Sequence, residues 1–180
     1  MAEDFARQLP AGYASKEPYP EIKVRKHNRM YADLLMEDYS GAVSELTATL
    51  QYMYHSFEFK DKYEGLSDLL EKVAIIEMIH LEVLAEAIIA LGGNPVYKSG
   101  GLMNKKYWNA EMVDYGRNLC GRLESDLQAE YAAIRHYREH IARIDDPNIQ
   151  ALLKRIILDE EVHVILFKEA IEKYCKEKKK

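Results

Sequence analysis

The sequence predicts an all-α fold, an antiparallel four-helix bundle with one long crossover between its second and third helices. Three observations lead to this fold class. Only 9 glycines and 5 prolines occur in 180 residues, which favours long regular elements. Apolar residues recur at the spacing of one helix face in four long segments. The connections between these segments are short, long and short, and a long connection suits two helices that run parallel along a bundle.

The first half of the chain is expected to contain an arm and two helices. Residues 1–27 are rich in proline, tyrosine and charge, show no helical period and are predicted to form an extended N-terminal arm. Helical periodicity then continues over about 28–59, which predicts one uninterrupted helix. A turn follows, and Ser67 can cap a second helix that runs to Leu91. Gly92, together with the glycine and the proline that follow it, ends this helix.

The second half is expected to contain the crossover and two more helices. Residues 92–111 form the crossover, for which no regular structure is predicted. A third helix is expected over about 112–144. Asp146 is a good N-cap for a fourth helix, and Pro147 suits the first helical position. This last helix is expected to reach about Tyr174.

Two stretches repeat the same pattern, a Glu and a His three residues apart inside an apolar helical stripe. They are Glu77-Met78-Ile79-His80 and Glu160-Glu161-Val162-His163. Residues at i and i+3 share a helix face, so each motif points a carboxylate and an imidazole into the expected core. A buried carboxylate needs a partner, and a metal ion is one of the few partners that satisfies several carboxylates at once.

The two halves of the chain repeat each other around these motifs. Apolar residues fall at the same offsets from each motif: Leu70, Val73, Leu84 and Ile88 in the first half, and Leu153, Ile156, Phe167 and Ile171 in the second. Two further segments match in the same way. Each has one Glu, small residues three positions later and a Tyr two turns on, namely Glu45 with Tyr52 and Glu130 with Tyr137. Two helix hairpins related by a pseudo-two-fold axis are therefore expected.

This repeat places six candidate metal ligands near the middle of the predicted bundle: Glu45, Glu77, His80, Glu130, Glu160 and His163. Mixed imidazole and carboxylate ligation suits two Fe or two Mn ions per chain and does not separate them. The alternative is that these glutamates face solvent or form salt bridges. However, no Lys or Arg shares the stripe within a turn of Glu45, Glu77 or Glu160. Uncompensated buried carboxylates would unfold a domain worth only about 5–15 kcal/mol, so a dinuclear metal site is the favoured interpretation.

Four further polar residues near this site are open to more than one interpretation. Tyr52 and Tyr137 are candidate catalytic residues, since each could hydrogen-bond a metal ligand or supply an electron, or could be an ordinary core tyrosine. Asp126 could be an acceptor behind the ligands or an entry-path carboxylate, or could lie on a solvated helix face. Asp159 could orient a ligating histidine from the opposite helix.

The remaining histidines of the bundle are not expected to bind metal. His55 lies near the Glu45 stripe, nearly three turns further on, and is expected to be a histidine at the edge of the core. His136 and His140 lie off the Glu130 stripe and are expected to be exposed.

Composition and charge narrow the function classes. The chain is long enough for one domain, residues 28–175, with a charged tail at 176–180. Its formal net charge of −5 argues against a nucleic-acid partner. No apolar run reaches the roughly 18 residues of a membrane span, and the N-terminus lacks the apolar core of a secretory signal, so no membrane partner and a cytoplasmic location are expected. Cys120 and Cys175 form no CxxC pair, which excludes zinc-ribbon and rubredoxin-type sites. A disulfide between them is possible in principle, but two thiols in a cytosolic chain are expected to be unpaired.

At these motifs the chain resembles the ferritin-like superfamily of rubrerythrins, bacterioferritins and manganese catalases, over about residues 28–174. The match consists of one Glu, a Glu-x-x-His, a second Glu and a second Glu-x-x-His in this order, with the long crossover between the halves. The resemblance implies a role for each ligand: bridging carboxylates Glu77 and Glu160, terminal carboxylates Glu45 and Glu130, and one capping histidine for each metal, His80 and His163.

The chain also departs from these family members. Rubrerythrins usually add a rubredoxin module with paired CxxC motifs and carry an extra Glu at the position of Ala133, so a peroxidase with a built-in electron donor is not expected. Bacterioferritins share the Glu-Met-x-His sequence, where their Met can bind haem, but haem at Met78 is not expected here. They also add a fifth helix for their cage, and this chain ends within about six residues of the fourth helix, so a cage is not expected.

The resemblance implies an oxidoreductase that acts on hydrogen peroxide or dioxygen with two Fe or two Mn ions per chain, either a rubrerythrin-like peroxidase or a manganese-catalase-like enzyme. A catalase cycle needs no external donor, whereas a peroxidase cycle would need a separate electron-transfer protein. One alternative is a ferroxidase or iron-storage protein of the bacterioferritin type, and another is a structural spore-layer protein with a vestigial metal site. An aromatic crossover with Tyr97, Met103, Tyr107 and Trp108 predicts a homodimer or small homo-oligomer.

Overall fold

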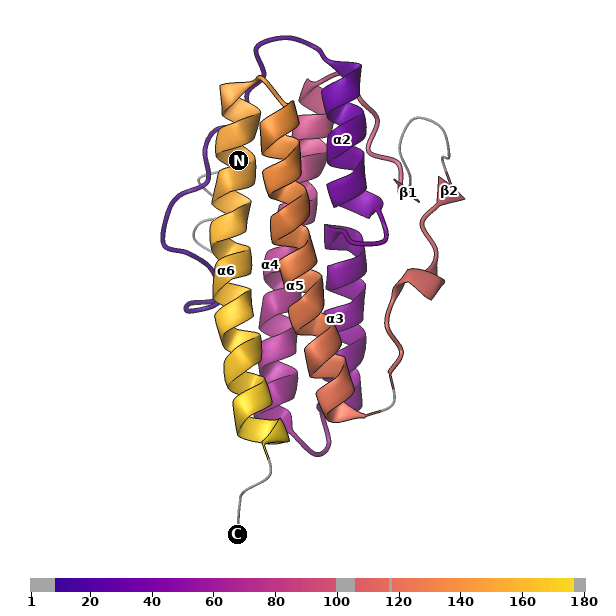
Figure 1. Ribbon diagram of the computed structural model, residues 1–180, viewed down its shortest axis with the longest axis vertical. Coiled ribbons are helices and arrows are strands. Elements are labelled where there is room, and N and C mark those ends of the chain that lie inside the picture. Colours follow the sequence, from indigo (N-terminus) through magenta and orange to yellow (C-terminus); the bar gives the residue numbers. More distant parts are fainter. Residues whose placement is uncertain (1–8, 100–105, 117, 177–180) are drawn as a thin grey trace.

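A computed structural model describes residues 9–99, 106–116 and 118–176, and it confirms the predicted helical bundle. Within these residues five α-helices build the bundle: α2 (Arg29–Ser40), α3 (Glu45–Phe59), α4 (Glu64–Ala90), α5 (Leu119–Arg143) and α6 (Pro147–Cys175). In Figure 1, α2 and α3 follow one another along one row, beside α4, α5 and α6. Helix α3 packs mainly against α4, and α5 packs mainly against α6, as expected for two hairpins.

The prediction of one uninterrupted first helix is wrong, because residues 41–44 separate α2 from α3. A Cβ added to Gly41 would lie 2.5 Å from the carbonyl oxygen one turn back, so the chain needs glycine at this close approach. Ser44 caps α3 by accepting a hydrogen bond from the Thr47 amide. The hydroxyls of Ser44 and Thr47 both donate to the Gly41 carbonyl oxygen. The two hydroxyls therefore pair with backbone groups that have no partner inside a helix. The break makes Glu45 the first residue of α3.

The other predicted boundaries hold only in part. Helix α4 begins one turn before the predicted cap, so Ser67 lies inside the helix, where its hydroxyl pairs with that of Ser56 at 2.9 Å. Helix α5 begins later than predicted, after Asn118, whose side chain caps its first turn. The predicted start of α6 is confirmed, with Asp146 as the N-cap and Pro147 as the first residue.

The crossover contains regular structure that the sequence did not predict. Strand β1 (Lys98–Ser99) pairs antiparallel with β2 (Lys106–Tyr107), and the short 3-10 helix η1 (Ala110–Met112) follows. Figure 1 shows β2 and η1 beside the α2–α3 row, on its outer side. Nε1 of Trp108 donates to Oγ1 of Thr47 at 2.9 Å, which ties the crossover to the first turn of α3.

The prediction of two unpaired thiols is wrong, because Cys120 and Cys175 form a disulfide. Cys120 lies at the start of α5 and Cys175 at the end of α6, and their Cα atoms are 5.6 Å apart. In an antiparallel hairpin the start of one helix lies beside the end of the next. The fold therefore brings the two cysteines together, although 55 residues separate them in the sequence.

Replacing Cys120 with serine is expected to lower the free energy of unfolding by about 2–4 kcal/mol, because the bond restricts the unfolded chain across a long loop. Urea unfolding of the oxidised wild type and of Cys120→Ser measures the difference. The same comparison in excess reductant is the control, and there the two proteins should unfold alike. Equal stability under oxidising conditions would contradict the expected contribution of the disulfide.

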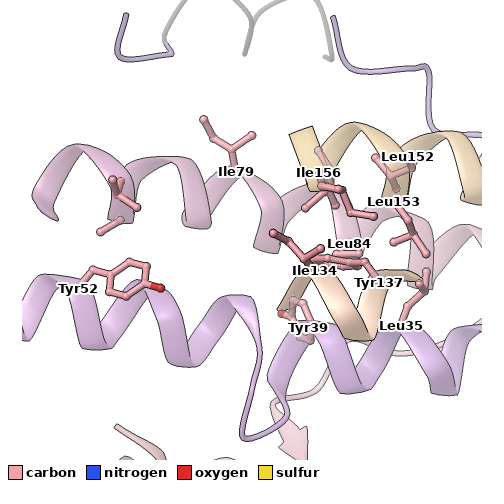
Figure 2. Close-up of a cluster of buried hydrophobic side chains, with 14 of the residues drawn as sticks. Leu35, Tyr39, Tyr52, Ile79, Leu84, Ile134, Tyr137, Leu152, Leu153 and Ile156 are labelled. Atoms are coloured by element: carbon pink, nitrogen blue, oxygen red, sulfur yellow. The ribbon is translucent and has the colours of Figure 1, made fainter. Parts of the chain in front are cut away.

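The apolar stripes predicted from the repeat form a continuous core. Leu70, Val73, Leu84, Ile88, Leu153, Ile156 and Phe167 are fully buried, and Ile171 is half-buried. Figure 2 shows how Leu35 of α2, Leu84 of α4, Ile134 of α5 and Leu153 of α6 gather in one part of this core. None of the helices in residues 9–99, 106–116 and 118–176 combines the length and the hydrophobicity of a membrane span.

Candidate metal centre

Six side chains from four helices meet inside the bundle. Each of them is at most 3% exposed: Glu45 on α3, Glu77 and His80 on α4, Glu130 on α5, and Glu160 and His163 on α6. The helical repeat that the sequence predicted explains this meeting, because each Glu-x-x-His motif lies on an inward stripe opposite a lone Glu. The structure thus brings together every residue of the predicted ligand set.

The six side chains form two overlapping groups whose potential ligand atoms lie within 4.8 Å of one another: Glu45, Glu77, His80 and Glu160 in one, and Glu77, Glu130, Glu160 and His163 in the other. Glu77 and Glu160 belong to both groups. Nδ1 of His80 lies 2.9 Å from Oε2 of Glu77 and 3.3 Å from Oε1 of Glu160. Nδ1 of His163 lies 3.0 Å from Oε2 of Glu160 and 2.9 Å from Oε1 of Glu77. Two carboxylates therefore stand between the two imidazoles.

Burial and mutual repulsion determine the ionisation of the four carboxyl groups. Burial raises the pKa of Glu45 well above its usual range, and the charges of Glu160 and Glu77 raise it further. The pKa of Glu130 is raised well above its usual range for the same reasons. Burial also opposes ionisation of Glu77 and Glu160, but the two neighbouring imidazoles outweigh burial and lower the pKa of both carboxyls.

The two imidazoles carry the compensating charge when no metal is bound. Burial opposes protonation of His80, but Tyr19 and the carboxylates around the ring outweigh it and raise its pKa well above the usual range. Burial likewise opposes protonation of His163, and Glu77 and Glu130 outweigh it with the same result. Two cations are therefore favoured between these carboxylates, and metal ions would have to displace the two protons.

The outer nitrogen of each ring makes a hydrogen bond that leaves the inner nitrogen for a ligand. Nε2 of His163 lies 3.0 Å from the carbonyl oxygen of Tyr13. A carbonyl oxygen only accepts, so Nε2 carries the proton. Nε2 of His80 lies 3.1 Å from Oδ2 of Asp159, which is likewise an acceptor when ionised. In the neutral rings each Nδ1 is then a lone pair that faces carboxylate oxygens, an arrangement that a metal cation stabilises.

Two buried oxygens test whether the site fits metal ions. Oε1 of Glu77 and Oε1 of Glu160 have no hydrogen-bond partner. Nδ1 of His163 lies 2.9 Å from Oε1 of Glu77, but without the geometry of a hydrogen bond. A buried acceptor without a partner costs about 1–3 kcal/mol or more, and a cation between the two groups would satisfy both oxygens. The donor set and its unsatisfied atoms therefore fit two ions with nitrogen and oxygen ligands.

Each candidate tyrosine donates a hydrogen bond to the lone glutamate of the other half. The Tyr52 hydroxyl donates to Oε1 of Glu130 at 2.6 Å, and the Tyr137 hydroxyl donates to Oε1 of Glu45. Burial raises the pKa of Tyr52 well above its usual range, and the charge of Glu130 raises it further, so this phenol keeps its proton. Of the interpretations left open by the sequence, hydrogen bonding to the candidate ligands is the one that the contacts support.

Asp159 lies behind His80, in the position that the sequence suggested for it. Its Oδ2 accepts hydrogen bonds from Nε2 of His80 and from the Tyr19 hydroxyl at 2.5 Å. Its Oδ1 accepts from the Ser15 amide at 2.7 Å and lies 2.6 Å from Nη1 of Arg155. Burial opposes ionisation of Asp159, but the hydrogen bonds from His80 and Tyr19 and the neighbouring Arg155 guanidinium outweigh it and lower its pKa to about 2.

Asp126 is fully buried rather than on a solvated helix face, and it organises a second polar cluster. Its two oxygens accept from Nε2 of Gln51 at 2.8 Å and pair with Nδ1 of His55 at 2.9 Å. Oε1 of Gln51 accepts from the Asp114 amide, and Nε2 of His55 lies 2.8 Å from the Asp114 carbonyl oxygen. His55 is thus a fully buried residue outside both ligand groups, and this cluster holds the crossover against α3.

Replacing Asp126 with alanine is expected to lower the free energy of unfolding by about 3–5 kcal/mol, because a buried imidazole and a buried amide lose their acceptor. Urea unfolding measures the loss. Glu124→Ala, on an exposed position of the same helix, is the matched control and should change stability by no more than about 0.5 kcal/mol. Similar effects for the two variants would contradict a structural role for the buried cluster.

The prediction that His140 is exposed is wrong, since its side chain is 3% exposed. Nδ1 of His140 lies 2.7 Å from Oδ2 of Asp38 on α2. Burial opposes protonation of His140, but the hydrogen bond and the charge of Asp38 outweigh it and raise its pKa. His136, one turn earlier, is half-buried. The error arises because Asp38 of α2 pairs with His140 across the bundle, a tertiary contact that the residue spacing along α5 does not predict.

A pocket of about 540 Å³ between α3 and α5 reaches the four carboxylates of the six-residue cluster. Its inner end is formed by the four carboxylates, and its sides include Ala48 of α3 together with Ala129, Ala132 and Ala133 of α5. Residues 42–44 of the break and 111–114 of the crossover complete the wall. The small side chains and the break thus give a small molecule access to the cluster from one side.

Sequence reasoning missed the part that the N-terminal arm plays around the site. The arm supplies the Tyr13 carbonyl to His163, and the Ser15 amide and the Tyr19 hydroxyl to Asp159. A backbone group leaves no trace in the sequence, and an arm without periodicity offers no register from which to predict its contacts. The available signal was Arg155, a cation one turn before Asp159 on the inward side of α6.

The fold and the paired Glu and Glu-x-x-His elements define a class, the four-helix-bundle proteins with a carboxylate and histidine site inside the bundle. The sequence profile of the Ferritin-like domain matches residues 42–175, which is most of the chain. The chain therefore belongs to the ferritin-like family.

Individual relatives agree with this assignment. A probable manganese catalase from Clostridium acetobutylicum is 30% identical over 171 residues, covering 85% of this chain and 75% of that protein. The crystal structure of KatB, a manganese catalase from Anabaena PCC7120, superimposes with a TM-score of 0.80 at 27% identity, covering 90% of this chain and 80% of that one. Bacterioferritin from Rhodobacter capsulatus superimposes with a TM-score of 0.69 at 25% identity, covering 83% of this chain and 88% of that one.

Proposed function

We propose that the protein is a dinuclear manganese or iron oxidoreductase that removes hydrogen peroxide, in the manner of a manganese catalase. The observation that carries the proposal is the pocket that reaches the four carboxylates shared among two overlapping groups of carboxylate and imidazole donors. The similarity to manganese catalases supports the choice of substrate. Two neighbouring redox-active ions would supply electron exchange with both oxygens of one peroxide molecule.

The protein's own residues would hold the ions and keep their charge balanced. Glu77 and Glu160 belong to both ligand groups and are therefore the proposed bridges. Glu45 with His80, and Glu130 with His163, complete one set each. Tyr52 and Tyr137 donate hydrogen bonds to the terminal carboxylates and so fix which oxygen is free to bind. Tyr52 and Tyr137, the candidate catalytic residues of the sequence analysis, are therefore proposed as positioning residues.

The chain itself favours a catalase cycle over a peroxidase cycle. Its sequence contains two cysteines and no CxxC pair, and the two cysteines are joined in a disulfide. A peroxidase cycle would need an electron donor in addition to the residues of the bundle. Disproportionation needs none, since two peroxide molecules yield two waters and one dioxygen.

Oxygen release tests the proposed function directly. Protein loaded anaerobically with Mn(II), freed of excess metal and mixed with hydrogen peroxide should release one dioxygen for every two peroxides consumed. The Glu77→Ala, Glu160→Ala double variant should be inactive. Peroxide consumption that requires an added reductant would point to a peroxidase cycle, and the absence of any peroxide consumption would contradict the proposal.

Iron handling is the second candidate, and the structural similarity to bacterioferritin favours it. It predicts rapid Fe(II) oxidation with mineral formation inside a large hollow assembly, which light scattering would detect. A homodimer or small homo-oligomer, formed through exposed residues such as Tyr97 and Tyr107, has no storage cavity. Trp108 of the predicted patch is half-buried and bonded to Thr47, and Met103 lies outside the described residues. A structural role with a vestigial site would leave assembly intact in the same double variant.

A further inference from the structure

The N-terminal arm, residues 9–27, covers the outer side of both candidate metal-binding histidines. Figure 1 shows the arm running along α6. The Tyr13 carbonyl oxygen accepts a hydrogen bond from Nε2 of His163 at 3.0 Å. Two residues later in the chain the Ser15 amide reaches Asp159, the residue that accepts from Nε2 of His80. One continuous segment thus supplies the hydrogen-bond partner of His163 and contacts Asp159, the hydrogen-bond partner of His80.

We propose that this arm is a positioning element of the metal centre, which fixes the tautomer and the orientation of both histidines so that each Nδ1 faces a metal ion. The inference rests on the metal centre of the proposed function, but not on its peroxide chemistry. It assigns the arm a role in metal affinity, and it makes Tyr19 and Arg155 positioning residues.

The hydrogen bonds on Asp159 explain how the arm acts on His80. The Ser15 amide and the Tyr19 hydroxyl donate hydrogen bonds to the carboxylate, and Nη1 of Arg155 forms an ion pair with its Oδ1 at 2.6 Å. Tyr19 shares Oδ2 with Nε2 of His80, while Ser15 and Arg155 contact Oδ1. These contacts hold the plane of the carboxylate, and an ionised carboxylate can only accept a hydrogen bond from the ring. The ring must then keep its proton on Nε2 and present Nδ1 to the ligand cluster.

Arg155 holds the arm beside Asp159 through hydrogen bonds to two carbonyl oxygens of the arm. Its side chain is 4% exposed, which is unusual for a cation. Its Nε donates to the Glu17 carbonyl oxygen at 2.5 Å, and its Nη2 donates to the Ser15 carbonyl oxygen at 3.2 Å. The guanidinium also lies 4.1 Å from the centre of the Tyr19 ring. One buried side chain therefore joins the arm, Asp159 and α6 in a single unit.

Removing one arm contact should weaken metal binding without breaking the bundle. Tyr19→Phe is expected to lower the affinity for Mn(II), measured by competition with a chelator, by about 10–100-fold for one of the two ions. Asp159→Asn should have a larger effect, because its amide group can turn toward His80 and favour the tautomer with the proton on Nδ1. Tyr31→Phe is the matched control, since it deletes a hydroxyl that binds the Asp145 amide at 3.0 Å, and it should leave the affinity unchanged.

The coupling must also act in the other direction, because linkage between two binding events is reciprocal. Mn(II) is therefore expected to slow tryptic cleavage after Lys16, an exposed residue in the middle of the arm, by about tenfold or more. Cleavage after Lys62, in the exposed turn between α3 and α4, is the internal control and should not change. In Tyr19→Phe the protection of Lys16 should shrink together with the affinity.

Neither measurement uses peroxide, so the two proposals can fail separately. A wild type that binds two ions, with an affinity that Tyr19→Phe changes by less than twofold and a cleavage rate at Lys16 that Mn(II) does not alter, would overturn the role of the arm. A wild type that binds two ions and shows the arm effects but consumes no peroxide would contradict only the proposed enzyme function.

Discussion

Loading the metal-free protein with Mn(II) is expected to raise its free energy of unfolding by about 4 kcal/mol for each ion, at a free concentration about a thousand times the dissociation constant. The reason is that only the folded chain brings the two ligand groups together, whereas the unfolded chain offers scattered carboxylates. Two ions would then contribute about 8 kcal/mol, which is comparable to the whole stability of an ordinary domain. Urea unfolding in buffered Mn(II) measures the shift of the midpoint.

The Glu77→Ala, Glu160→Ala double variant is the control for this stabilisation. Both groups lose their shared carboxylates, so Mn(II) should leave its midpoint unchanged. An equal shift in the wild type and in the double variant would show that Mn(II) acts elsewhere on the protein.

The same stabilisation is expected to grow as pH rises from about 5 to 8. The folded metal-free protein raises the pKa of His80, His163, Glu45 and Glu130, so these groups hold protons that the unfolded chain releases at lower pH. Their contribution to stability is present below the unfolded pKa values and is lost as pH rises, so the metal-free protein becomes less stable. Metal ions compete with these protons and bind more tightly at higher pH. The lowered pKa values of Glu77 and Glu160 act only below about pH 4.5 and do not reverse the trend.

Replacing Glu45 and Glu130 together with glutamine is expected to stabilise the metal-free protein at pH 8 by roughly 1–3 kcal/mol while weakening metal binding by more than about 100-fold. Both carboxyls resist ionisation because they are buried beside Glu77 and Glu160. A glutamine oxygen can still accept the hydrogen bonds from Tyr52 and Tyr137, so the packing is kept. If the two carboxyls serve metal binding at a cost in stability, the double variant should have a higher free energy of unfolding without metal and a lower affinity for Mn(II).

Urea unfolding without metal and chelator competition with Mn(II) measure the two effects. Glu124→Gln, at an exposed position on α5, is the control and should change neither quantity. A double variant that is less stable than the wild type without metal would contradict the account of these two carboxyls.

Features that depend on helical periodicity could be predicted from the sequence. Glu77 with His80, and Glu160 with His163, lie on inward stripes because three residues bring side chains to the same helix face. The equal offsets in the two halves then predicted which lone glutamates would face them. The same regularity predicted the hairpins. Two local signals, Asp146 as the N-cap and Pro147 as the first residue, predicted the start of α6.

Features that depend on tertiary contacts or on single local exceptions could not be predicted in this way. The break before Glu45 depends on Gly41 and on two hydroxyls that cap it, which a periodic pattern averages away. The disulfide between Cys120 and Cys175 depends on how two helix ends meet. The contacts of the arm use backbone groups, and their position is set by the buried Arg155 rather than by any repeat.

The metal content of the purified protein tests the central claim most directly. Elemental analysis after anaerobic loading with Mn(II) or Fe(II), and after removal of loosely bound ions, should find about two ions per chain, and none in the Glu77→Ala, Glu160→Ala double variant. A wild type that retains no metal under these conditions would contradict the dinuclear centre and leave the buried carboxylates of this bundle without the partner that their arrangement requires.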